Sequence, residues 1–128
     1  MEESHVTKTV REALVKAADK GEDLKVKVAE ITKNAVKKAL SETEPTKEKV
    51  EAVARDTMEG VVRGAEETGM KVETLTKMAV EGIVEGTKES GTKTAGFAKH
   101  AARATVDVAK KAGDKALEIA KSVEKKVP

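Results

Sequence analysis

The sequence predicts an all-α protein of long amphipathic helices, and three observations support this. A step of eleven residues from Val6 meets an uncharged residue every time as far as Val127. The series that start at Val10 and Ala13 are also free of charge. Because 38% of the chain is charged, random placement would put roughly 13 charged residues in these 34 positions. Eleven residues make three helical turns of about 3.67 residues each, so the uncharged positions share one helix face.

The length of 128 residues suits one domain, residues 1–128. Three helices of similar length with short connections favour an antiparallel three-helix bundle. We expect the helices at 6–41, 46–89 and 93–126, joined by turns at 42–45 and 90–92.

Proline, glycine and capping residues mark these breaks. Pro45 is tolerated in a helix only within its first turn, and Thr46 is a suitable N-cap. Gly91 suits a left-handed C-cap and is followed by Thr92, a second N-cap candidate. Gly21 is the best candidate for a further kink, within the first helix.

The apolar residues are small. Nineteen are Ala and 17 are Val, which leaves 13 Leu, Ile, Met and Phe, so a thick core is excluded. Two glycine pairs, Gly60 with Gly64 and Gly82 with Gly86, have a four-residue spacing. Such pairs let two helices approach closely, although a loosened helix is equally compatible.

The expected apolar face is wider than the seam of a two-stranded coiled coil, which suits a bundle or contact with an apolar surface. Phe97, the single aromatic residue, lies on it and is interpreted as a core residue, with an anchor into lipid or a partner as the alternative. The residues that represent the face are Val50, Val53, Val61, Val72, Leu75, Ile83, Phe97, Val108 and Ile119.

Lysines border this face and acidic residues lie behind it. Long lysine stems can lie along hydrocarbon while their ammonium groups reach lipid phosphates. Alternatively, the lysines cover the seam of a bundle and pair with acids one turn away. Residues 91–128 hold nine basic and four acidic residues. The candidate contacts to an anionic surface are Lys88, Lys93, Lys99, Lys110, Lys115 and Lys121.

These patterns resemble two families of amphipathic helical proteins. The eleven-residue period, with Thr and Ala on the apolar face and Lys at its borders, is similar to group 3 late embryogenesis abundant proteins, most closely over residues 105–115 and 92–99. Exchangeable apolipoproteins share the period and the lysine-bordered geometry. The resemblance implies a non-enzymatic role: the protection of membranes and proteins during water loss, or the coating of lipid.

No pattern in the sequence indicates catalysis. Cysteine is absent, which excludes thiol chemistry and cysteine metal sites. His5 and His100 lie far apart in sequence and have no carboxylate pairing typical of a metal site. The glycine spacing over residues 86–93 resembles a phosphate loop, but Thr-Lys stands in place of Lys-Thr and no strand precedes it. We therefore expect no enzyme activity, no cofactor, no metal and no small-molecule substrate.

The chain is expected in the cytoplasm, because no apolar run approaches 18 residues and the first five residues are too polar for a signal peptide. Nucleic acid is not expected as a partner, because the basic last third has just one arginine, Arg103, and its one aromatic residue, Phe97, is interpreted as a core residue and not as a platform for base stacking. The first hypothesis is a protein that binds or protects membranes or apolar surfaces. The alternative is a structural or oligomerisation module with a closed core and a protein partner, and self-association fits either hypothesis.

Overall fold

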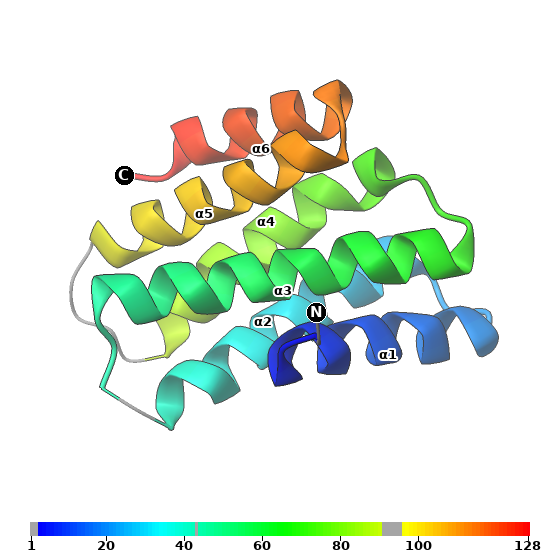
Figure 1. Cartoon of the computed structure of the whole chain (residues 1–128), viewed down its shortest axis with the longest axis horizontal. Helices are drawn as coiled ribbons and strands as arrows, with labels where there is room; N and C mark the ends of the chain where they lie inside the picture. The colour runs from blue at the N-terminus through cyan, green and yellow to red at the C-terminus, as the bar shows by residue number, and fades with distance from the viewer. Residues whose placement is uncertain (1–2, 43, 91–95) are drawn as a thin grey trace.

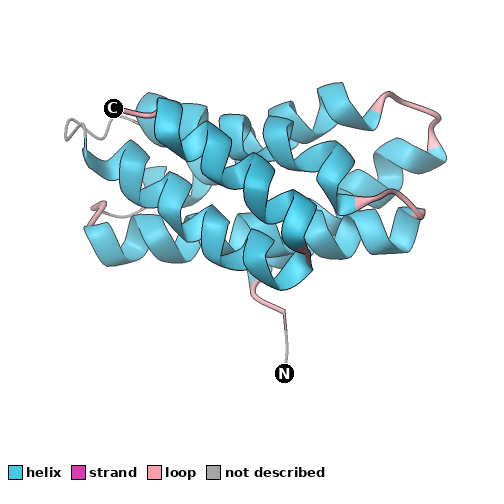
Figure 2. Cartoon of the chain, turned by 90° about the horizontal axis from the view of Figure 1, so that it is seen from above, coloured by secondary structure: helices cyan, strands magenta, loops and turns pink. Residues whose placement is uncertain are grey.

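The fold is all-α, as the sequence predicts. The computed structural model describes residues 3–42, 44–90 and 96–128, and these form helices and loops without a strand (Figure 1, Figure 2). In chain order the helices are α1 (His5–Asp19), α2 (Leu24–Ser41), α3 (Lys47–Thr68), α4 (Val72–Glu89), α5 (Gly96–Ala112) and α6 (Asp114–Lys126).

The expectation of three long helices is wrong, because each of them is divided into two. The helices expected at 6–41, 46–89 and 93–126 are interrupted at Gly21, Gly69 and Gly113, whose φ angles are +73°, +76° and +140°. Glycine takes up positive φ without the steric cost of a Cβ atom. The uncharged pattern runs through all three breaks without a change of register, so the periodicity did not reveal them.

Local hydrogen bonds explain where several helices begin and end. The side chain of Ser4 accepts a hydrogen bond from the Thr7 amide, and the side chain of Asp23 accepts one from the Lys25 amide. Between α2 and α3, the N-cap is Thr46, whose hydroxyl accepts from the backbone N–H of Lys49. The turn expected at 90–92 lies outside the described residues except for Ser90, the C-cap of α4.

The six helices form three hairpins that stack on one another. Figure 1 shows α1–α2, α3–α4 and α5–α6 as successive tiers, with the turns of all three hairpins at the same end of the molecule. Helices α1, α3 and α5 therefore run in one direction, and α2, α4 and α6 in the other. Within the described residues, the middle hairpin contacts both others, whereas α1–α2 and α5–α6 do not touch.

Glycines on α3 bring it very close to α1. A methyl group placed on Gly60 would lie 2.6 Å from Val10 Cβ and 2.7 Å from the carbonyl oxygen of Thr7. One turn further along both helices, a methyl group on Gly64 would lie 2.9 Å from Leu14 Cδ1. A step of four residues along α3 is matched by a step of four residues in the same direction along α1, so the two helices are parallel. The crossing leaves no room for a side chain at either glycine.

The same arrangement joins α2 to α4. A Cβ atom on Gly82 would collide with Thr32 Oγ1 and would lie 2.5 Å from the carbonyl oxygen of Ala29. A Cβ atom on Gly86 would lie 3.0 Å from Val36 Cβ. In each contact between α2 and α4, both residues have sequence numbers 22 higher than those of the equivalent contact between α1 and α3. Of the two interpretations that the sequence left open for the glycine pairs, the structure shows close approach at both crossings.

Several buried threonines in the core donate their hydroxyls within their own helices, whereas buried Thr7 donates to α3. Buried Thr32 donates to the carbonyl oxygen of Val28 at 2.8 Å, and buried Thr57 donates to that of Val53 at 2.7 Å. No buried side-chain nitrogen or oxygen in the described ranges lacks a hydrogen-bond partner. Threonine therefore fills core positions here without leaving an unsatisfied polar group.

We predict that Gly82→Ala destabilises the protein, although alanine is the better helix former by roughly 1 kcal/mol. Its methyl group would overlap the hydroxyl of Thr32 and the backbone of Ala29, and such overpacking costs about 1–3 kcal/mol. Urea denaturation measures the change in the free energy of unfolding. Gly96→Ala is the matched control, because a Cβ atom there meets nothing within 4 Å. Equal stability of the two variants would refute the close crossing.

Candidate functional site

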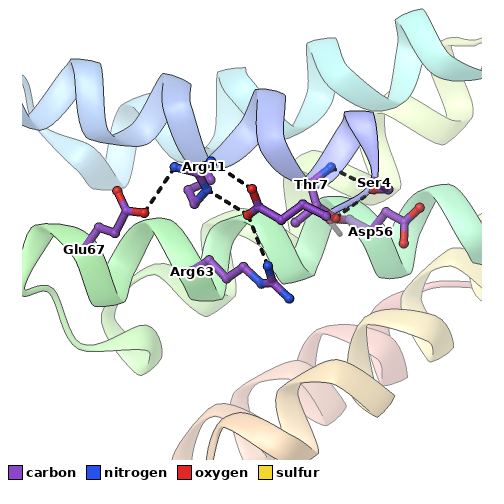
Figure 3. A network of polar contacts seen from close by, with 7 residues as sticks. Ser4, Thr7, Arg11, Asp56, Arg63 and Glu67 are labelled. Atoms are coloured by element: carbon purple, nitrogen blue, oxygen red, sulfur yellow. Dashed lines mark hydrogen bonds and ion pairs between the residues drawn. The ribbon is translucent and has the colours of Figure 1, made fainter. Parts of the chain in front are cut away.

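A cluster of charged side chains lies where α1 meets α3 (Figure 3). The guanidinium group of Arg11 donates to both carboxylate oxygens of Glu3, at 2.7 and 2.8 Å, and to Glu67 at 3.1 Å. Arg63 approaches Glu3 from the other side, at 3.2 Å. Nearby, the Thr7 hydroxyl donates to the carbonyl oxygen of Asp56 on α3 at 2.8 Å. The cluster thus connects the N-terminal part of α1 to residues 56–67 of α3.

The charged groups of this cluster form ion pairs with one another. Hydrogen bonds from Arg11 lower the pKa of Glu3, and the charge of Arg63 adds to the effect. The carboxylate of Glu3 in turn raises the pKa of Arg11. Both groups therefore stay charged at neutral pH, and the cluster acts as a clamp between two helices.

The basic surface of hairpin α5–α6 is the better candidate for a binding site. Residues 96–128 hold eight basic and four acidic residues. Lysines in the last turn of each helix and Asp114 in the first turn of α6 suit the helix dipoles. The inner face is mostly alanine and valine, so the hairpin is amphipathic. Its exposed lysines are Lys110, Lys111, Lys115, Lys121, Lys125 and Lys126.

The lysines expected to meet an anionic surface lie in three kinds of environment. Lys88 on α4 and Lys110 and Lys121 on the outer hairpin are exposed. Across the described part of the chain these three ammonium groups make no ion pair within 4.0 Å. Lys115 is also exposed, at 3.9 Å from Glu73. Lys93 lies outside the described residues.

Lys99 differs from the others because it caps a helix. Its ammonium group donates to the carbonyl oxygens of Glu124 and Val127 at the C-terminal end of α6, at 2.6 and 3.3 Å. Its side chain is only 26% exposed. In the folded hairpin, Lys99 thus gives a charged donor to two carbonyl groups at the end of the helix. The Glu124 carbonyl oxygen also accepts from the backbone N–H of Val127.

The residues expected on the apolar face lie largely in the core. Phe97 and Val72 are half-buried and pack against the core, and Ile119 is half-buried. The remaining six are buried, between 0 and 5% exposed: Val50, Val53, Val61, Leu75, Ile83 and Val108. The helices therefore cover their apolar faces with one another.

A second surface feature is an open groove of about 790 Å³ across α2, α4 and α6. Val26 borders it and is 60% exposed, the highest exposure of any large hydrophobic side chain that the structure describes. Acidic Glu30 and Glu85 and basic Lys88 and Lys126 also line the groove. This mixed charge does not select a ligand of one sign.

The described residues form neither a metal site nor a membrane-spanning helix. Among them, no three His, Asp or Glu side chains gather as metal ligands would. None of their helices combines the length and the apolar character needed to cross a membrane. Comparisons with protein families, curated proteins and solved structures found no match to this chain.

Sequence reasoning missed Lys111, Lys125 and Lys126 as exposed cations of the same hairpin. Lys111 and Lys125 were overlooked because they lie outside the two series that border the apolar face, from which the candidates mainly came. Lys126 belongs to one of these two series, eleven residues after Lys115, and was not chosen. The surplus of basic residues over residues 91–128 could have indicated them, because it includes every lysine of this segment whatever its position on the helix.

Lys99→Met is predicted to lower the free energy of unfolding by about 1–2 kcal/mol, because two carbonyl groups lose a charged donor while the aliphatic stem is kept. Urea denaturation followed by circular dichroism measures this. Lys121→Met, at an exposed lysine in the middle of α6, should change stability by less than about 0.5 kcal/mol. If the two variants were equally stable, Lys99 would have no capping role.

Proposed function

We propose that this chain is a non-enzymatic, amphipathic helical protein that binds and protects anionic membrane surfaces. The supporting observation is the basic outer surface of α5–α6, at one end of the stack of hairpins (Figure 1). The surplus of basic residues in this hairpin faces outward, while its apolar residues face the rest of the protein.

The chemistry of such a surface favours lipid phosphates. Each lysine close to an anionic membrane contributes about 1 kcal/mol, and the attraction falls off within a Debye length, about 8 Å in physiological salt. Six exposed lysines on one hairpin are therefore enough for reversible binding. We place this activity in the cytoplasm, where the membrane leaflet carries anionic lipid.

A structural module with a protein partner is the second candidate. It is favoured by the closed core, which leaves Val26 as the most exposed large hydrophobic side chain in the described ranges. The groove beside Val26 would receive the partner or a second copy of the chain. This alternative requires no contribution from the lysines of α5–α6.

Reversal of two of these lysines tests the proposal. We predict that Lys110→Glu combined with Lys121→Glu weakens binding to phosphatidylserine-containing vesicles by more than about tenfold, since two attractive contacts of about 1 kcal/mol each become repulsive. Vesicle co-sedimentation at low and physiological salt measures the partition coefficient, and circular dichroism checks that the helices persist.

Lys8→Glu combined with Lys25→Glu is the matched control, because both residues are exposed lysines of the opposite hairpin. This variant has the same net charge and should retain most of the binding. Equal losses in both variants would mean that net charge alone drives binding. Absence of binding by the unmodified protein would favour the protein-partner alternative.

A further inference from the structure

Hairpin α5–α6 occupies an end of the stack and is held from one side only. In the described residues it contacts α3 and α4, and nothing in α1 or α2. Stability in a linear stack is approximately a sum of terms between neighbouring units. An end unit can therefore separate by breaking a single interface, whereas α3–α4 would have to break two.

The fully buried side chains that α5 and α6 contribute to this interface are small, and the larger Phe97 is only half-buried. The largest fully buried side chains all lie between Thr7 and Ile83, and therefore within α1–α4. In contrast, α5 and α6 bury mainly alanine, with Val108 and Val123 as their larger apolar residues within the helices. Burial of a methyl group removes much less apolar surface from water than burial of a leucine or methionine. The end hairpin is thus attached with the least hydrophobic stabilisation.

The polar contacts across this interface are also weak. His100 lies 3.7 Å from Glu51 on α3, and Lys115 lies 3.9 Å from Glu73 on α4. Both distances are near the upper limit for an ion pair, Lys115 is largely exposed, and the first pair is charged only when His100 is protonated. Such pairs contribute little to stability. The opposite interface has the buried Thr7 hydroxyl bonded to the α3 backbone and the paired charges of Arg11.

The hairpin itself is connected internally. Lys99 on α5 caps the end of α6, and Arg103 donates to the Glu124 carboxylate at 3.3 Å. Both contacts join α5 to α6 without involving α3 or α4. The two helices are therefore able to move together as one unit.

We propose that hairpin α5–α6 separates from α1–α4 as a unit when the protein binds an anionic membrane, and that α1–α4 stay folded. This inference rests on the proposed function and describes its control by the fold. The buried alanine and valine face of the hairpin then meets the lipid, and the lysines beside it remain at the phosphates. In the absence of a membrane the same face is covered by α3 and α4.

Two crosslinked variants test the separation, and the natural absence of cysteine makes them specific. Glu51→Cys with His100→Cys, joined by a short thiol-cleavable crosslinker, ties α5 to α3. Arg103→Cys with Glu124→Cys, joined by the same reagent, ties α5 to α6 and allows the hairpin to separate from α3 and α4. The binding of each to phosphatidylserine-containing vesicles is compared before and after the crosslink is cleaved by a reductant.

We expect the 51–100 crosslink to lower vesicle binding at least tenfold and its cleavage to restore binding, whereas the 103–124 crosslink has little effect. If the 51–100 crosslinked protein binds as well as its cleaved form, the separation is refuted, but the proposed membrane function stands. If the unmodified protein and every cleaved variant fail to bind vesicles, both proposals are wrong.

Discussion

The structure depends on two helix crossings that have no room for a side chain. At Gly60 and Gly82 the neighbouring helix backbone lies where a Cβ atom would otherwise be. Close backbone approach allows small residues to pack densely, so a chain rich in alanine, valine and threonine can still form a core. The two crossings also fix hairpins α1–α2 and α3–α4 in parallel, with equivalent contacts 22 residues apart.

The third hairpin lacks an equivalent crossing. Gly96 and Gly113, its two glycines in the described residues, meet no atoms within 4 Å of a Cβ position, and its buried residues are mainly alanine. The molecule therefore combines a more tightly built unit, α1–α4, with a more weakly attached basic hairpin. Regions that move in function are generally drawn from the less stable parts of a protein. Basic charge and weak attachment coincide here in one element.

The sequence predicted the helical class, because the class follows from spacing along a helix. The spacing of the glycine pairs was compatible with close contacts but did not distinguish them from a loosened helix. It did not predict the turns at Gly69 and Gly113, since the uncharged pattern continues through them and nine glycines offered many possible positions. The surplus of lysine in the last third was visible from composition. The capping role of Lys99 was not, because it depends on α6 folding back beside α5.

Hairpin α5–α6 is expected to open more readily than α1–α4. Native-state hydrogen exchange of the backbone amides, at increasing concentrations of denaturant below the unfolding transition, measures this difference. We expect the amides of α5 and α6 to exchange through a shared opening with a lower free energy than those buried in α1–α4. A single opening free energy for all six helices, equal to that of global unfolding, would contradict it.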